Sequence, residues 1–195
     1  MSCSVENSTE ENTTLEKTED PLNLDTAIFY HEDDYCQIQI LPEENDSALI
    51  EQAQKIIGDT FIKKDKLGHE SIIVREEENI PLINRKIELQ EVEAFFDSMS
   101  TQKHWTVATG YGQSHRELST RTLAYGQEYS AVYTSFTKDS LVENIWLTNP
   151  FTLADSGLID ACYKIGSSYQ LVLMDWNSLT LVYLSDSIAV SNYLR

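Results

Sequence analysis

Cysteine, basic residues and long apolar runs are all scarce in this chain of 195 residues. The three cysteines, Cys3, Cys36 and Cys162, are too few and too scattered for a disulfide framework, so a reducing cytoplasm is the expected compartment. No run approaches the roughly 18 apolar residues of a membrane span. The first 20 residues hold neither a basic segment nor an apolar one, so we expect no secretory signal.

Lysine and arginine are outnumbered by acids, 14 against 32, which gives a net charge of −18. Residues 1–52 hold 14 of the acids against Lys17 alone, a local charge of −13, and the other 143 residues carry −5. Such a charge keeps a protein soluble, opposes nucleic-acid phosphates and anionic membranes, and attracts basic proteins. The expected partner is therefore a basic protein, with no direct contact to nucleic acid or membrane.

Composition divides the chain into a tail and a body. Residues 1–24 are rich in Glu, Ser, Thr and Asn and nearly free of large apolar side chains, which predicts a disordered acidic tail. Residues 25–195 are long enough for one domain with a substantial core. The sequence leaves the oligomeric state open.

The C-terminal stretch, residues 169–195, is the best specified. Leu171–Met174 is apolar without a break, which predicts a strand buried on both faces. Asn177 and Ser178 favour a turn, and Thr180–Leu184 has the composition of a partner strand. Ser185 or Asp186 can cap a short final helix. The rest of the chain is expected to supply strands that pair with this unit.

Further elements follow from periodicity and turn residues. Thr26–Leu41 is interpreted as two strands around the turn at residues 31–34, with Cys36, Ile38 and Ile40 facing a core and Tyr35, Gln37 and Gln39 facing solvent. The remaining predictions are helices over 43–57, 88–99 and 153–165, the first and last stopped by Gly58 and Gly166, and strands over 70–75, 82–89, 104–109, 131–136 and 141–148. Hairpins dominate, so we predict an α+β domain: a mostly antiparallel sheet of about six strands covered by three or four helices.

The turn His31-Glu32-Asp33-Asp34, followed by Cys36, is the densest group of potential ligands. It can be a metal site, an ordinary solvated turn or a loop that contacts a partner. No metal or cofactor is assigned to it. The acidic run Glu76-Glu77-Glu78 is a second charged turn, and tyrosines and tryptophans beside such acids would suit binding to a basic protein.

Catalytic alternatives are present only as separate residues. Cys36 with His31 could form a thiolate pair. Ser114 and His115, with Asp175 or Asp186, contain the atoms of a hydrolytic triad but lack its nucleophile elbow. Gly110-Tyr111-Gly112 is half of a dinucleotide-binding turn, and a plain turn or a loop at a binding edge is the simpler interpretation. For an enzyme, the first residues to test are His31, Cys36, His104 and His115.

The C-terminal run LVLMDWNSLTLVYLSDSIAVSNYLR resembles the end of bacterial immunity proteins of the SMI1/KNR4-like (SUKH) family. In that family a strand ending in Asp-Trp, a turn, a second strand and a short helix ending in Tyr-Leu recur. The resemblance implies a non-catalytic, toxin-neutralising binding protein from a bacterium.

The sequence therefore predicts a cytoplasmic binding protein, most simply an immunity-type inhibitor that engages a basic partner. The predicted contact residues are Asp33, Asp34, Glu76, Glu77 and Glu78. Two alternatives stay open: an enzyme of unrecognised, hydrolase-like class, and an acidic mimic of nucleic acid that occupies a basic groove.

Overall fold

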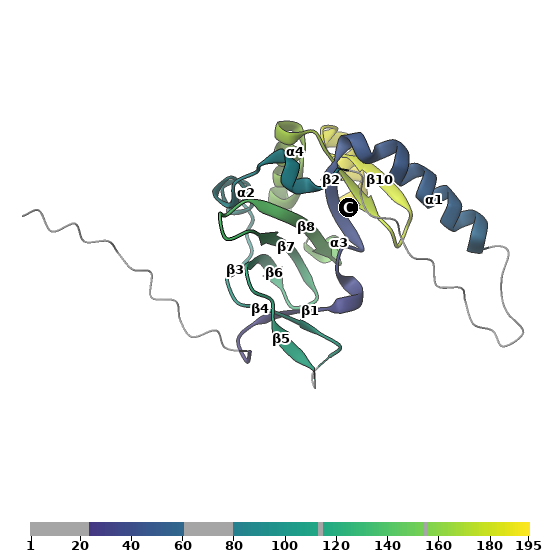
Figure 1. Ribbon diagram of the computed structural model, residues 1–195. Coiled ribbons are helices and arrows are strands. Elements are labelled where there is room, and N and C mark those ends of the chain that lie inside the picture. The colour runs from purple at the N-terminus through teal and green to yellow at the C-terminus, as the bar shows by residue number, and fades with distance from the viewer. Residues whose placement is uncertain (1–23, 61–79, 113–114, 154–155) are drawn as a thin grey trace, which may run out of the picture.

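The computed structural model describes residues 24–60, 80–112, 115–153 and 156–195 (Figure 1). In chain order the elements are β1 (Ile28–His31), η1 (Glu32–Asp34), β2 (Ile38–Pro42), η2 (Glu43–Asn45), α1 (Asp46–Thr60), η3 (Leu82–Arg85), α2 (Leu89–Phe96), β3 (Lys103–His104), β4 (Val107–Gly110), β5 (Arg116–Leu118), β6 (Thr122–Gln127), β7 (Ser130–Phe136), β8 (Val142–Thr148), α3 (Pro150–Leu153), α4 (Ser156–Tyr169), β9 (Leu171–Asp175), β10 (Thr180–Tyr183) and α5 (Ser187–Leu194). The η elements are single 3-10 turns. The α+β class is confirmed, with more strands than the sequence predicts.

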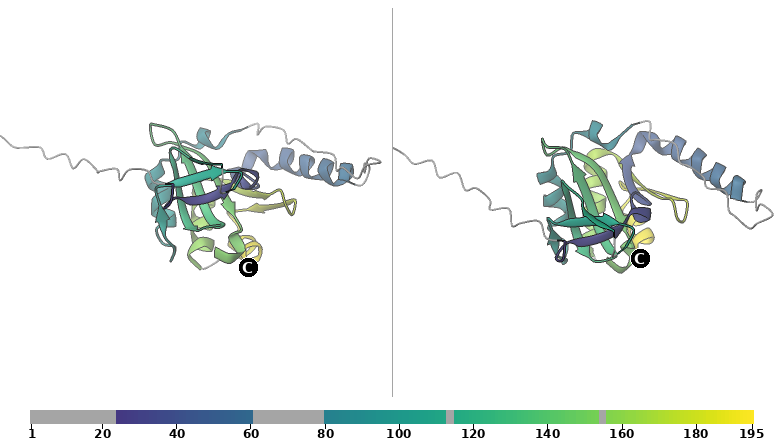
Figure 2. Two further views of the ribbon diagram at one scale, coloured as in Figure 1. Left: turned by 90° about the horizontal axis from the view of Figure 1, so that it is seen from below. Right: turned by 60° about the horizontal axis from the view of Figure 1, so that its bottom comes forward.

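The strands form two sheets. Seven strands pair antiparallel in the order β10-β9-β2-β8-β7-β6-β3. The other three form a small sheet in the order β1-β4-β5, in which β1 runs parallel to β4 and β4 antiparallel to β5. The small sheet lies across the large one (Figure 2). Hairpins supply four of the eight strand pairs, a smaller share than the sequence predicts.

Three apolar clusters cover both faces of the large sheet. Helices α2, α4 and α5 pack on one face, where Phe96, Ile165 and Val190 meet alternate residues of the strands. On the opposite face, β1 and β4 cover the part around Trp146, and α1 covers the part around Met174. The body therefore has three layers, and α1 extends away from it along one side (Figure 1).

The C-terminal unit is confirmed as predicted. Strand β9 is buried at all five positions, and β10 pairs with it. Asp186 caps α5 by accepting hydrogen bonds from the next helical N–H groups. The buried Asp175 carboxylate holds the β9–β10 turn through the Asn177 N–H at 2.9 Å and receives the Tyr193 hydroxyl at 3.0 Å. Burial, followed by the Asp175 carboxylate, raises the pKa of Tyr193 above its usual value.

The predicted hairpin over Thr26–Leu41 is wrong. Strand β1 joins the small sheet, whereas β2 inserts between β8 and β9 of the large sheet. The predicted solvent face of β2 is also wrong, since Gln39 is buried against Trp146 and Met174 of the neighbouring strands. Alternation in one strand cannot show that a second layer covers its polar side. The β7–β8 hairpin is confirmed.

The two glycines predicted to stop helices do not do so. Helix α1 continues through Gly58 to Thr60. Gly166 lies inside α4, where an added Cβ would stand 2.0 Å from the Cβ of Leu184. Leu184 packs directly on the helix backbone at Gly166, so a residue with a side chain does not fit there.

Two predicted strands also differ from the structure. Residues 82–85 form the 3-10 turn η3 instead of starting a strand, and only Glu88 of the segment bridges to Leu141. Residues 104–109 divide between β3 in the large sheet and β4 in the small one. Residues 1–23 of the predicted tail and the predicted strand over 70–75 lie outside the described residues. In the described ranges no helix combines the length and apolar character needed to cross a membrane.

Candidate functional site: an acidic and aromatic end of the sheet

The turn η1 presents three consecutive carboxylates where β1 ends. The Asp33 N–H donates to Nδ1 of His31 at 3.2 Å, which caps the turn. Asp33 and Asp34 are exposed and Glu32 is half-buried. Among the ion pairs of the described residues, none joins a lysine or arginine to these three carboxylates. Within the described ranges, their charge is therefore not compensated by an ion pair with lysine or arginine.

Two exposed tyrosines stand beside these carboxylates. Tyr111, 66% exposed, packs edge-on against the His31 ring with centroids 5.8 Å apart. Its hydroxyl hydrogen-bonds Glu32, and this bond raises the pKa of Tyr111. Tyr35, 41% exposed, packs edge-on against Trp146 at 4.9 Å. Both rings are thus exposed to solvent and held in place by neighbours.

A buried aromatic cluster supports Tyr35. Trp146 stacks on Tyr133 with centroids 5.2 Å apart, and Tyr30 meets both rings edge-on at 5.0 and 5.3 Å. The Tyr133 hydroxyl donates to the Phe29 carbonyl at 3.3 Å, which joins β7 to β1. Offset and edge-on aromatic pairs are the favoured geometries, so this cluster is a rigid base for the surface above it.

The β6–β7 turn reaches the same end of the large sheet. Strand β2 begins at Ile38 opposite Leu147, and β7 begins near Thr148, so η1 and this turn lie near the same strand ends. Burial is the main cause that raises the pKa of Tyr133, and the charges of Asp34 and Glu128 raise it further. The carboxylates of both turns therefore act electrostatically on the same buried tyrosine.

We call this region the acidic–aromatic end and define it by seven residues: Glu32, Asp33, Asp34, Glu128, Tyr35, Tyr111 and Tyr129. Tyr129 follows Glu128 in the turn and is 58% exposed. Glu128 differs from the η1 acids because Arg116 approaches its carboxylate at 3.4 Å. The site is an exposed surface of negative charge and aromatic rings, which suits binding of a cationic surface.

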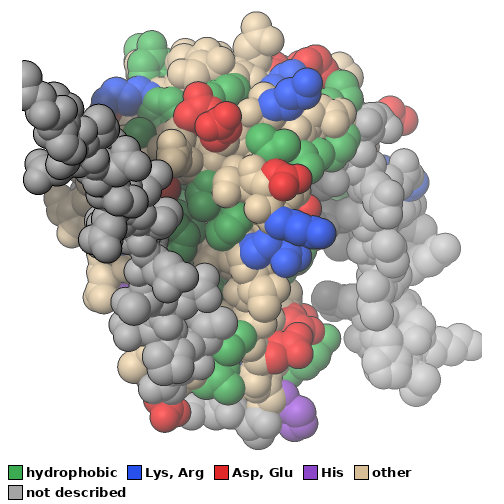
Figure 3. All heavy atoms as spheres, turned by 60° about the vertical axis from the view of Figure 1, so that its left-hand side comes forward, with side chains coloured by type: hydrophobic (Ala, Val, Ile, Leu, Met, Phe, Trp, Pro, Cys, Tyr) green, Lys and Arg blue, Asp and Glu red, His purple; other side chains and the backbone are tan. Residues whose placement is uncertain are grey.

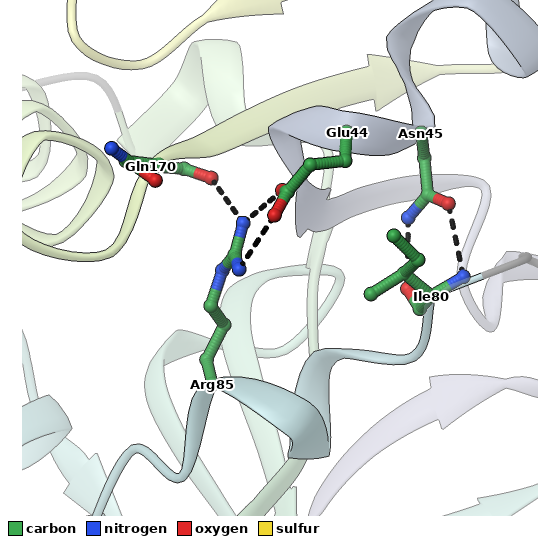
Figure 4. A network of polar contacts seen from close by, with 5 residues as sticks. All are labelled: Glu44, Asn45, Ile80, Arg85 and Gln170. Carbon is green, nitrogen blue, oxygen red and sulfur yellow. Dashed lines mark hydrogen bonds and ion pairs between the residues drawn. The ribbon is translucent and has the colours of Figure 1, made fainter.

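The acids that follow β2 in the sequence have a different role (Figure 4). Both guanidinium Nη atoms of Arg85 bind Glu44, and one of them also donates to the Gln170 carbonyl at 3.2 Å. The hydrogen bonding of Arg85 to Glu44 is the main cause that lowers the pKa of Glu44. The Asn45 amide pairs with both backbone groups of Ile80, at 2.8 and 3.1 Å. These contacts hold η2 against the segment that leads into η3. The charge of Glu44 is neutralised by Arg85.

The negative charge is not spread over every face of the molecule. Figure 3 shows one face on which acidic, basic and hydrophobic side chains lie interspersed among the described residues. Over the four described ranges, 20 acids stand against nine bases, a net charge of −11. Between residues 24 and 52 there are eight acids and no base, and β2 separates them into the η1 group and the group around Glu44.

Of the predicted contact residues, Asp33 and Asp34 lie in the acidic–aromatic end, and Glu76, Glu77 and Glu78 lie outside the described residues. The sequence gives no sign that Tyr111 and Glu128 join them, because β1–β4 and β6–β7 pairing bring these residues to η1. The placing of Gly110-Tyr111-Gly112 at a binding edge stays a prediction.

Several residues considered for catalysis have structural roles in the described part of the chain. Cys36 is buried with a φ of 54°, and one ring nitrogen of His31 already accepts the Asp33 N–H. Asp175 and Asp186, the two acids considered for a triad, hold a turn and cap a helix. Burial raises the pKa of Cys162 to about 12, so its thiol stays protonated. In the ranges that the structure describes, no three His, Cys, Asp or Glu side chains gather as metal ligands would.

Comparison with protein-family models, with curated proteins and with solved structures finds no match. The functional argument therefore starts from the acidic–aromatic end itself.

Proposed function

We propose that this protein is a non-catalytic binding protein that engages a basic protein partner through its acidic–aromatic end. One observation carries the proposal: the η1 carboxylates have no lysine or arginine partner among the described residues, and they adjoin two exposed, well-supported tyrosines. Elsewhere the comparable acid Glu44 is neutralised by Arg85. In the described part of the chain, Arg116 pairs with Glu128 but no lysine or arginine pairs with the η1 carboxylates, so a basic partner would supply cations to these carboxylates.

The two kinds of side chain contribute differently to binding. Carboxylates steer a basic partner during diffusion and raise the association rate, an effect that salt screens. Tyrosines are enriched among the residues that contribute most to affinity, because they bury a large area and lose little conformational entropy. A lysine or arginine of the partner can also lie over an exposed tyrosine ring. Tyr35 and Tyr111 are preorganised by their neighbours, which lowers the entropic cost of binding.

The kind of partner follows from the resemblance of the C-terminal run to SUKH immunity proteins. We propose an immunity-type inhibitor in a bacterial cytoplasm whose partner is a basic toxin, such as a nuclease with a cationic surface. The run Glu76–Glu78, outside the described residues, is a further predicted contact. The enzyme and nucleic-acid-mimic alternatives stay predictions of the sequence alone.

Capture from an extract of the native host tests the proposal. At low salt the full chain is expected to retain one basic protein, which is released as the salt concentration rises. The double variant Asp33→Asn/Asp34→Asn keeps the side-chain shapes and removes two charges. It is expected to bind this protein roughly tenfold or more weakly.

A matched control is available at the opposite end of the large sheet. Asp139 and Glu143 are exposed and flank the β7–β8 turn, so Asp139→Asn/Glu143→Gln changes the net charge equally. This control should bind as the wild type does. Equal loss in both double variants would show that net charge alone acts, and capture of no basic protein would contradict the proposed function.

A further inference from the structure

The Nδ1 atom of His31 lies close to two different groups of Asp33. Its Nδ1 lies 3.2 Å from the backbone nitrogen of Asp33 and 3.5 Å from the Oδ2 of the Asp33 carboxylate. A neutral Nδ1 can accept the Asp33 N–H, whereas a protonated Nδ1 can only donate, and the carboxylate is then its acceptor. The two contacts are therefore mutually exclusive.

We infer that His31 is a proton-dependent switch of η1 that selects between the Asp33 N–H and the Asp33 carboxylate. In the structure Nδ1 accepts the N–H, so the neutral ring carries its proton on Nε2. Protonation releases the N–H that caps η1 and draws the Asp33 carboxylate to the imidazolium. Imidazole is the side chain that ordinarily changes charge between about pH 5 and 8.

The surroundings of His31 hold charges of both signs. From β5, the Arg116 guanidinium lies 4.4 Å from the ring centroid of Phe29, two positions before His31 in β1. Within η1 the charged groups are Glu32, Asp33 and Asp34. From the loop after β4 comes Tyr111, whose ring packs on the imidazole and whose hydroxyl bonds Glu32. The His31 side chain is 36% exposed, so solvent reaches part of it. A change at its Nδ1 is thus transmitted to a carboxylate and to the ring of an exposed tyrosine.

The switch regulates the site of the proposed function and rests on that function for its consequence. Protonation adds one positive charge within the acidic–aromatic end and occupies the Asp33 carboxylate. A basic partner then meets a less negative surface with a rearranged turn. Binding is expected to be several-fold weaker at pH 5.5 than at pH 7.5.

Nuclear magnetic resonance of the isotope-labelled full chain, without a partner, tests the switch itself. Between pH 8 and 5 the amide resonance of Asp33 is expected to shift with the same midpoint as the His31 ring. The ring nitrogen shifts at pH 8 should report a proton on Nε2. Unperturbed carboxyl groups are ionised over most of this range, so an Asp33 amide shift that follows the His31 ring would report the imidazole.

Two variants separate the switch from general pH effects. His31→Asn keeps a side-chain oxygen that can cap the turn but does not titrate, so its Asp33 amide should stay constant from pH 8 to 5. His104→Asn, in β3 at the far edge of the large sheet, should leave the Asp33 titration unchanged. An Asp33 amide that ignores the His31 midpoint, or that still titrates in His31→Asn, would overturn the inference.

Capture of the basic protein at the two pH values distinguishes the switch from the function. If the function holds and the switch fails, the wild type binds equally at both pH values while Asp33→Asn/Asp34→Asn still loses binding. If the function fails, no basic protein is captured, and the resonance titration of Asp33 still decides the switch.

Discussion

Trp146→Ala is expected to lower the free energy of unfolding by about 3–5 kcal/mol. Trp146 is 1% exposed and contacts three tyrosine rings, of which Tyr35 is part of the acidic–aromatic end. Its indole nitrogen has no hydrogen-bond partner among the described residues, so lost packing accounts for the whole effect. The loss is a large fraction of the ordinary stability of a domain. Chemical denaturation followed by circular dichroism measures it.

Trp105→Ala is the matched control. Trp105 is 49% exposed, with the Lys103 ammonium 5.3 Å from its ring centroid. A cation–π contact at an exposed site contributes about 0.5–1 kcal/mol, and half of the side chain already lies in solvent, so this variant should lose clearly less stability than Trp146→Ala. If the two tryptophan variants were equally destabilised, the aromatic cluster would not be the base that supports Tyr35.

Alanine at Gly166 and alanine at Gly58 are expected to change stability in opposite directions. In a helix, alanine is more favourable than glycine by about 1 kcal/mol. Gly58 has open space around it in α1, so Gly58→Ala should stabilise the protein. At Gly166 the new methyl group would stand 2.0 Å from the Cβ and 2.8 Å from the carbonyl carbon of Leu184. Neither atom can rotate away, so α4 must separate from the chain before α5.

That separation should destabilise Gly166→Ala by about 1–3 kcal/mol after the helix preference has been included. Thermal and urea unfolding of both variants give the sign directly. Stabilisation by both substitutions would mean that Leu184 does not pack on the backbone of α4.

Local sequence patterns predict the parts of the fold that depend on neighbours in the chain. The unit from β9 to α5 and the β7–β8 hairpin are closed by short turns, so apolar runs and turn residues suffice to locate them. The helices α1, α2 and α4 follow from their apolar stripes. Each of these elements has its partner close in sequence or carries its own periodicity.

Local sequence patterns do not predict pairing between segments that lie far apart in the chain. Ile28 pairs with Val107 in a parallel register, and β2 lies between two strands from the second half of the chain. Gln39 has the polarity of a solvent-facing residue and is buried because another layer covers it. Gly166 shows the same limit, since Leu184, which its backbone contacts, lies beyond the two strands β9 and β10.

The candidate site likewise has residues that the sequence predicts and residues that it does not predict. A dense acidic turn predicts Asp33 and Asp34 from the sequence. The neighbouring acid Glu44 looks equivalent in sequence, yet Arg85, 41 positions further on, neutralises it. Tyr111 joins the site only because β1 and β4 pair. Charge counted along the chain therefore overstates the acidic surface and omits its aromatic part.

The central claim is that the acidic–aromatic end contacts a basic partner, and site-specific photo-crosslinking tests it most directly. A benzophenone amino acid replaces Tyr111 in one full chain and Tyr163, an exposed residue of α4, in another. In extract of the native host, the probe at position 111 should form one adduct with a basic protein, and the probe at position 163 should form none. An adduct at 163 alone, or none at 111, would contradict the account.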